Sequence, residues 1–291
     1  MKTHHEIIRS LPEWKKQNLK IHRLSGGMTN FNYLVSIEKK RYVVRFAPSI
    51  SKSLGLDRAR EIFNYGVAYK QGIGPRIFKH YPYHSALIVE YLEGRPLTKK
   101  QSKRPEAIKS VAGLLKKLHQ GNVLKGKRSP AQRGRDYIEQ AKQLKAWLPS
   151  DISWYLKQVK LVEKRLSPIS KTDPCHQDLM FGNIVLSRTG KYRLIDWEYS
   201  GSADRRFDLA MFSVKGSFGK KEDSILVHNY APNNTEKLYN DLQYMKLIVF
   251  FAEAAYGLLQ NAISQRQDVN YKSYALENLK GFKRLAKKLK L

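Results

Sequence analysis

Residues 175–183 set the strongest constraint on the fold of this 291-residue chain. Their sequence is Cys-His-Gln-Asp-Leu-Met-Phe-Gly-Asn. Two short runs of β-prone residues follow it, with a turn sequence between them, and Asp196 comes directly after the second run. Asp178, Asn183 and Asp196 therefore bring two carboxylates and one amide into one short segment. Oxygen atoms of such groups are the ligands that hard divalent cations take in proteins. We expect a metal-binding site on a loop and a β-hairpin.

The register of this hairpin decides whether the ligands meet. If the turn is centred on Thr189 and Gly190, Asn183 lies opposite Asp196 in the strand ladder. Opposed residues have Cβ atoms roughly 5 Å apart, which suits two oxygen ligands on one cation. The plainer alternative is a solvated hairpin that carries these groups by chance. The agreement of spacing, strands and turn favours the metal site.

Composition sets the bounds of the fold. Hydrophobic residues make up 42% of the chain, which is enough for one large core or two moderate lobes. The longest apolar run, 247–259, is shorter than a membrane span of roughly 20 residues and contains Glu253, so it is interpreted as a buried helix. The N-terminus lacks a signal-peptide core, and a single cysteine, Cys175, excludes an internal disulfide. We expect a soluble cytoplasmic protein.

The chain is strongly basic. It contains 54 Lys and Arg residues and 25 Asp and Glu residues, which gives a formal net charge of +29. Such a field attracts nucleotides, nucleic acids and anionic membranes. The basic residues are scattered, however, and no nucleic-acid motif accompanies them, so specific nucleic-acid binding is not expected. In the lysine-rich segment 271–291, leucines recur at helical spacing and would form an apolar stripe beside the charged residues. Docking on the rest of the fold is expected for it, with peripheral membrane contact as the alternative.

The first 92 residues alternate short strands with one main helix. A Gly-Gly turn between two strands, at 25–30, lets backbone amides approach a phosphate. On the strand over 41–46, Arg45 shares a face with Val43, and it occupies the place where kinases keep the cation that grips nucleotide phosphates. Glu61, on a helix over 56–70, is the candidate partner of Arg45. The alternatives are an ordinary surface arginine and an ordinary surface glutamate.

After a hinge at 93–97 the periodicity becomes helical. Helices are expected at 107–119, roughly 131–147 and 151–166, and over the remainder of the chain that follows the hairpin. The chain is therefore expected to be an α+β protein of two lobes. Residues 1–92 would form a small, β-rich N-terminal lobe that binds nucleotide. Residues 93–291 would form a larger, mostly helical lobe that carries the catalytic loop and the acceptor site.

These residues resemble the choline/ethanolamine kinase branch of the aminoglycoside phosphotransferase-like kinases. The resemblance covers most of residues 20–215. It is carried by His-x-Asp-x4-Asn at 176–183, by Ile-Asp-Trp-Glu-Tyr-Ser at 195–200, and by the segments at 24–30, 42–45, 57–61, 89–94, 118–120 and 208–210. It implies a bilobal protein-kinase-like fold, with ATP and Mg²⁺ as cofactors.

The resemblance also implies a role for each site residue. Asp178 would be the catalytic base, and Asn183 and Asp196 the magnesium ligands. His176 would support the loop near Asp196 without acting directly. The nucleotide would be held by Ser25, Gly26, Gly27, Thr29, Asn30, Arg45, Glu61, Glu90 and Leu92.

The acceptor site of this family is a box of aromatic and acidic side chains, which suits a quaternary ammonium through cation–π attraction. Family members fill it partly with tryptophans on a C-terminal helix, and this chain has none on the matching helix at 242–259. The candidates for the box are Trp197, Glu198, Tyr199, Phe250, Glu253 and Tyr256, with Asp208 as a further acid. Core packing of the Phe/Tyr stripe is the alternative.

The function expected is ATP- and Mg²⁺-dependent transfer of the γ-phosphate to the hydroxyl of a small cationic alcohol, choline or ethanolamine. A thiamine or aminoglycoside kinase is the alternative within the same chemistry. An inactive kinase-like module that binds nucleic acid or lipid is the alternative from another class, and the presence of Asp178, Asn183 and Asp196 argues against it.

Overall fold

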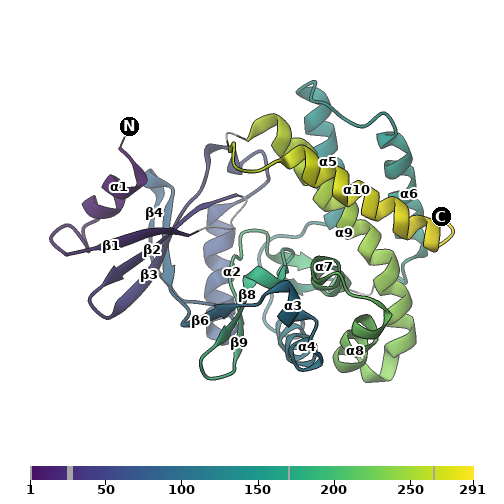
Figure 1. Ribbon diagram of the computed structural model, residues 1–291, viewed down its shortest axis with the longest axis horizontal. Coiled ribbons are helices and arrows are strands. Elements are labelled where there is room, and N and C mark those ends of the chain that lie inside the picture. Colours follow the sequence, from purple (N-terminus) through teal and green to yellow (C-terminus); the bar gives the residue numbers. More distant parts are fainter. Residues whose placement is uncertain (1, 25–28, 170, 265) are drawn as a thin grey trace.

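The computed structural model describes residues 2–24, 29–169, 171–264 and 266–291. Its N-terminal part is a five-stranded antiparallel sheet, and the chain after this sheet is mostly helical (Figure 1). The α+β arrangement predicted from the sequence is therefore confirmed. The sheet has the order β1-β2-β3-β5-β4, and its strands are β1 (Lys20–Leu24), β2 (Phe31–Ile37), β3 (Lys40–Phe46), β4 (Ile77–Tyr81) and β5 (Ala86–Glu90).

Each face of this sheet contributes buried side chains to a different core. Alternate residues of a strand point to opposite faces. One face therefore carries side chains such as Val35, Val44 and Ile88 toward helix α1 (His4–Ser10), where they form a small core. The opposite face carries Leu87 and Val89, which belong to the main core of the protein. Arg45 lies on this second face, so a charged side chain points toward the helical part.

Helix α2 (Arg58–Lys70) begins where Asp57 accepts a hydrogen bond from the Arg60 amide at 3.0 Å, which is a side-chain N-cap. Its buried side carries Glu61 and Tyr65. These residues are four apart, so they lie one above the other on one helix face. That face meets Arg45 of the sheet, as described below.

The helical part is built around α9 (Thr235–Ile263), which packs against α5, α6, α7, α8 and α10. The helix is long and apolar enough to cross a membrane, but 78% of its apolar window is buried inside the protein. It is the central core helix, as the sequence predicts for 247–259. The other helices are α3 (Lys99–Ser102), α4 (Pro105–His119), α5 (Pro130–Gln143), α6 (Ile152–Arg165), α7 (Arg206–Gly216), α8 (Lys220–Tyr230) and α10 (Tyr271–Lys288).

Helix α10 packs along α9 (Figure 1). Its inward side includes Ala275, Leu279 and Phe282, all of them buried, whereas its lysines are exposed. Docking onto the helical part is thus the arrangement of segment 271–291.

Short strands frame the catalytic stretch. Strands β8 (Ile184–Ser187) and β9 (Tyr192–Leu194) form the predicted hairpin, and β7 (Asp173–Cys175) precedes the loop. Two further strands were not predicted. The hinge segment forms β6 (Gly94–Pro96), which pairs with β8, and β10 (Gly201–Ala203) pairs with β7. The expectation of an all-helical chain after the hairpin was therefore wrong at β10.

Candidate active site

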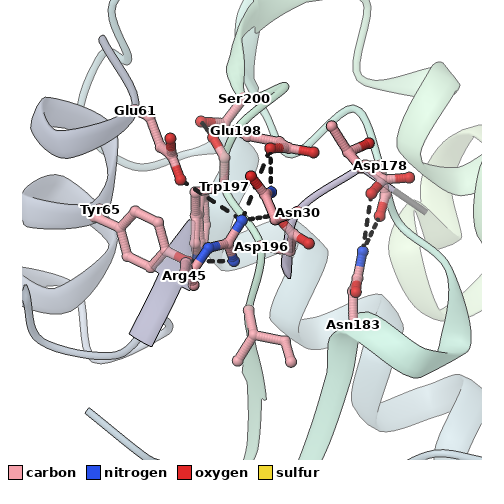
Figure 2. Close-up of polar contacts among 12 residues, drawn as sticks. Asn30, Arg45, Glu61, Tyr65, Asp178, Asn183, Asp196, Trp197, Glu198 and Ser200 are labelled. Atoms are coloured by element: carbon pink, nitrogen blue, oxygen red, sulfur yellow. Dashed lines mark hydrogen bonds and ion pairs between the residues drawn. The ribbon is translucent and has the colours of Figure 1, made fainter. Parts of the chain in front are cut away.

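Asp178 and Asn183 meet inside the loop between β7 and β8. The Asn183 Nδ2 donates to the Asp178 carbonyl at 2.8 Å and to Asp178 Oδ2 at 3.0 Å (Figure 2). A short 3₁₀ turn over Phe181–Asn183 closes the four-residue spacing and aims both side chains to one side. The amide nitrogen is thereby engaged, which leaves Asn183 Oδ1 as the atom for a cation.

The carboxylate of Asp208, on α7, binds the start of this loop. Its two carboxylate oxygens accept the backbone N–H groups of His176 and Gln177 at 2.7 and 2.8 Å, and His119 Nε2 lies 3.1 Å from one of them. Burial would raise the pKa of Asp208, but the hydrogen bonds and charge of His119 and the His176 amide outweigh it and hold the pKa below its ordinary value. The loop thus rests on a buried, ionised carboxylate.

His176 has the supporting position that the sequence analysis expects. Its side chain is buried against Trp197, and its Nε2 lies 2.9 Å from the carbonyl of Ile195. Burial lowers the pKa of His176, so the imidazole is neutral. It joins the catalytic loop to the segment that carries Asp196.

The register of the hairpin differs by one residue from the predicted one. Ile184 pairs with Leu194, and the Ile195 amide donates to the carbonyl of Asn183 at 3.0 Å. Ile195, and not Asp196, therefore lies opposite Asn183. Asp196 is the next residue and has a φ of +68°, a left-handed backbone that turns it out of the strand direction. Asp196 and Asn183 still line the same two cavities.

Arg45 is the centre of a buried charge cluster that joins the sheet to the hairpin (Figure 2). The guanidinium forms an ion pair with Asp196, and its other contacts are Glu61 at 3.7 Å, Glu198 at 3.8 Å and the hydroxyl of Tyr65 at 3.0 Å. Burial would lower the pKa of Arg45, but the carboxylate of Asp196 and the other negative partners outweigh it and raise it. The predicted Arg45–Glu61 contact is present. The alternative that both are ordinary surface residues was wrong, because each is buried.

The first cavity lies between the sheet and the helical part and has a volume of about 390 Å³. Apolar residues from the strands, among them Leu24, Val43 and Val89, form one wall. Glu90 and Leu92 lie at its rim, where the chain passes from the sheet to the helical part. Asn183 and Asp196 lie at its floor. An apolar wall together with a few polar groups in one cavity suits a nucleotide.

A second cavity of about 100 Å³ adjoins the first and contains Asp178. Four tyrosines and four carboxylates dominate its lining, together with one buried arginine. These residues are Tyr137, Tyr199, Tyr256, Tyr274, Asp178, Asp196, Glu198, Glu253 and Arg133. Thr29, which lies 3.2 Å from the Tyr256 hydroxyl, closes the cavity from the sheet side. The two cavities share Met180, Asn183 and Asp196.

A family model described as choline/ethanolamine kinase matches residues 21–246, which is most of the chain. This chain belongs to the choline/ethanolamine kinase family. It is therefore a small-molecule kinase, and the resemblance on which the sequence analysis relied is confirmed.

Individual relatives agree with this assignment. Protein LicA of Haemophilus influenzae is 26% identical over 263 residues, which cover 87% of this chain and 76% of LicA. Ethanolamine kinase 2 of Rattus norvegicus is 24% identical, over 89% of this chain and 74% of its own length. The solved structure of choline kinase LicA from Streptococcus pneumoniae superposes with a TM-score of 0.83 at 23% identity and covers 97% of this kinase and 100% of that chain. The kinase-like fold predicted from the sequence is therefore confirmed.

Three residues expected in the acceptor box lie elsewhere in this kinase. Trp197 is fully buried, donates its indole N–H to the Leu194 carbonyl at 3.0 Å and packs on His176. Phe250 lines a different cavity, between α9 and α10. Asp208 binds the catalytic loop and is no part of the acidic cavity lining. Glu198, Tyr199, Glu253 and Tyr256 do line the cavity.

The turn over residues 25–30, predicted to bind phosphate, is described only in part. Ser25, Gly26 and Gly27 lie outside the described residues. Thr29 and Asn30 are buried, and the Asn30 side chain donates to Glu198 at 2.5 Å (Figure 2). Thr29 lines the cavity that holds Asp178, and Asn30 reaches the same cavity only through its hydrogen bond to Glu198.

Sequence reasoning missed Arg133, Tyr137 and Tyr274. Arg133 and Tyr137 come from α5 and Tyr274 comes from α10, and each segment is remote in sequence from the catalytic stretch. The Arg133 guanidinium lies over the Tyr199 ring at 5.0 Å. A helix of mixed polar and apolar residues gives no local signal that one arginine points inward, so only the tertiary structure finds it.

The carboxylates of the acceptor cavity differ in charge state. Burial, followed by the charges of Asp196 and Glu253, raises the pKa of Asp178 to about 8. Burial and Asp196 also raise the pKa of Glu198. Glu253 differs because the ammonium of Lys215 and the hydroxyl of Tyr274 bind it, and these outweigh burial and lower its pKa. The cavity thus holds one ionised carboxylate away from the cleft.

The donor atoms at the floor of the cleft fit a magnesium ion. The Asn183 amide nitrogen is bonded to Asp178, whereas its Oδ1 atom takes no part in that contact. Asn183 and Asp196 line the same cavity. Amide and carboxylate oxygens are what Mg²⁺ prefers, usually one or two of them together with substrate phosphates.

Proposed function

We propose that this kinase uses Mg²⁺ and ATP to phosphorylate the hydroxyl of a small cationic alcohol, choline or ethanolamine. The observation that supports this most directly is the junction of the two cavities. They meet at Asn183 and Asp196, with Asp178 on the side of the smaller cavity. A nucleotide in the larger cavity would present its terminal phosphate to a hydroxyl in the smaller one.

ATP would lie with its adenine against the backbone at Glu90 and Leu92 and its phosphates toward Asn183 and Asp196. The buried Arg45 guanidinium holds Asp196 in place and adds positive charge at the phosphate end of the cleft. Ser25, Gly26, Gly27, Thr29 and Asn30 would cover the phosphates, and Glu61 would fix Arg45. Magnesium, held by Asn183 and Asp196, would neutralise the phosphate oxygens.

Chemistry would begin when the acceptor hydroxyl hydrogen-bonds to Asp178. The hydroxyl oxygen forms a bond to the γ-phosphorus while the bond from that phosphorus to the β-γ bridging oxygen breaks, and ADP leaves. Asp178 accepts the hydroxyl proton in its ionised form, which positive charge bound beside Asp196 would favour by lowering the raised pKa of Asp178. Positioning and electrostatics do most of the work in such transfers. The hydrogen bond from Asn183 orients the Asp178 carboxylate for this role.

The acceptor would be recognised by its positive charge. The ionised Glu253 and the rings of Tyr137, Tyr199 and Tyr256 surround the space beside Asp178. Aromatic faces attract an ammonium group by cation–π interaction, and a carboxylate adds a Coulombic attraction. Tyrosines here would take the place of the family's tryptophans.

The size of the smaller cavity favours a small alcohol over the alternatives. At about 100 Å³ it suits choline or ethanolamine better than the rings of an aminoglycoside or thiamine. The proposal of an inactive binding module is disfavoured because Asp178, Asn183 and Asp196 line one continuous site.

A substrate panel tests the proposal. Phosphate transfer from Mg-ATP is measured by coupled ADP release with choline, ethanolamine, thiamine and an aminoglycoside. We expect the highest kcat/KM with choline or ethanolamine. Equal background rates with all four alcohols would overturn the proposed acceptor class.

A further inference from the structure

A third cavity, of about 430 Å³, lies between α7, α8, α9 and α10 in the helical part. Figure 1 shows these four helices together, on the side of the molecule away from the sheet. None of the residues that line this cavity also lines the nucleotide cleft or the acceptor cavity. Its volume lies in the range of small-molecule sites, roughly 300–1,000 Å³. The proposed phosphoryl transfer gives it no role.

The lining of this cavity is strongly basic. It carries Lys220, Lys246, Arg284 and Lys288, against the single carboxylate of Asp223. These cations come from three helices, so the fold, and not a run of like charges in the sequence, gathers them. Bringing four cations to one concave surface is unfavourable unless an anion neutralises them.

The one carboxylate is already fully engaged. Asp223 pairs with the buried ammonium of Lys246, accepts the Ser213 hydroxyl at 2.6 Å and accepts the Gln243 amide at 3.2 Å. Among the residues that the structure describes, Lys220, Arg284 and Lys288 form no ion pair. Three uncompensated cations therefore face the same space.

The remaining walls are aromatic and hydroxylic. Phe218, Tyr239 and Phe250 supply rings, and Ser217 supplies a hydroxyl. Phe250 packs so closely on α10 that a Cβ at Gly281 would lie 2.6 Å from its ring, so the aromatic wall is firmly held. Basic groups beside fixed rings suit an anion that also has an apolar part.

We propose that this cavity binds a small organic phosphate. A phosphomonoester carries about −1.5 to −2 charges at pH 7 and three acceptor oxygens, which match the guanidinium of Arg284 and the ammonium groups of Lys220 and Lys288. Its organic part would lie against Phe218, Tyr239 and Phe250. Charge-assisted hydrogen bonds of this kind are roughly twice as strong as neutral ones.

Phenyl phosphate is a suitable probe because it combines a phosphate with a ring. Its binding to the full-length protein is measured by isothermal titration calorimetry at constant ionic strength. The test variant is Arg284→Gln with Lys288→Gln, which removes two exposed, unpaired cations of the cavity. The matched control is Lys280→Gln with Lys287→Gln, the same change of charge at exposed positions of the same helix that do not line the cavity.

We expect saturable binding to the wild type, an unchanged dissociation constant in the control, and at least a tenfold weaker one in Arg284→Gln/Lys288→Gln. Unfolding temperature and basal kinase activity should be equal in both variants, because neither touches the catalytic cleft. Phenyl phosphate bound only in the cleft would be held equally by both variants. Equal dissociation constants in all three proteins, or no saturable binding to the wild type, would overturn the proposal.

Discussion

Asn183 donates its side-chain N–H to the Asp178 carboxylate at 3.0 Å, so one residue orients the proposed base while its remaining oxygen is the proposed metal ligand. The contact spans only four intervening residues, and the last two of them lie in the 3₁₀ turn Phe181–Asn183. A change at Asn183 should therefore affect two properties at once.

Replacement of Asn183 by alanine should lower kcat at least a hundredfold and raise the Mg²⁺ concentration that gives half-maximal rate. The variant loses both an orienting hydrogen bond and a metal ligand. Steady-state rates over a magnesium titration measure both effects. Asn240→Ala, at an exposed position of α9, serves as the control and should match the wild type. An unchanged magnesium dependence in Asn183→Ala would contradict the ligand assignment.

Arg45→Met should destabilise the folded protein, because it leaves Asp196 and Glu198 without their cation. Arg45 is only 4% exposed, and breaking a buried ion pair from one side costs about 3–5 kcal/mol of the free energy of unfolding. Chemical denaturation measures the change. The KM for ATP should rise in the less damaging variant Arg45→Lys, since lysine lacks the planar fork.

Arg41→Met is the matched control for the stability experiment. Arg41 lies on the same strand and also forms an ion pair, with Glu93, but both side chains are partly exposed. Exposed pairs contribute about 0–1 kcal/mol. Equal losses in the Arg41 and Arg45 variants would show that burial of the cluster has no energetic consequence.

The catalytic stretch shows how far sequence reasoning reaches in this chain. The spacing from Asp178 to Asn183 predicts their meeting because a short loop leaves little freedom. The register of the hairpin was wrong by one residue because Thr-Gly is a weak turn signal, and the turn is centred on Thr189 and not between Thr189 and Gly190.

The acceptor side was harder to predict for a physical reason. Helix α9 is apolar around nearly its whole circumference, so periodicity does not tell which side faces a cavity. Glu253 was found because it is the single carboxylate within the apolar run 247–259 of this helix. Phe250 was misplaced because it resembles its neighbours, and Arg133 was missed because α5 gives no sign that it faces inward.

Asp178→Asn should make stability less dependent on pH. The pKa of Asp178 is about 8 in the folded protein and about 3.9 in an unfolded chain. Between these values the folded state binds a proton that the unfolded state has released, so the free energy of unfolding falls as pH rises from about 4 to 8. Asparagine has no such proton. The stability advantage of the variant should therefore grow from pH 5 to pH 8, in thermal unfolding with a chelator and without nucleotide. A constant difference across this range would contradict the raised pKa.

Glu253→Gln should raise the KM for a cationic acceptor about tenfold or more and leave the KM for ATP unchanged. The variant loses the ionised carboxylate of the acceptor cavity, whereas the nucleotide cleft has no contact with this residue. Steady-state kinetics with each substrate varied in turn measure the two constants. Glu236→Gln, at an exposed position of the same helix, is the control. An equal rise in both constants would point to a general structural effect.

The central claim is that Asp178 receives the proton of a choline or ethanolamine hydroxyl during phosphoryl transfer. The most direct measurement is kcat/KM for both alcohols with Mg-ATP, in the wild type and in Asp178→Ala. We expect kcat/KM to fall at least a hundredfold in the variant, with ATP binding preserved, since general-base catalysis contributes roughly 10²–10⁴ in rate. A variant that phosphorylates these alcohols as fast as the wild type would contradict it.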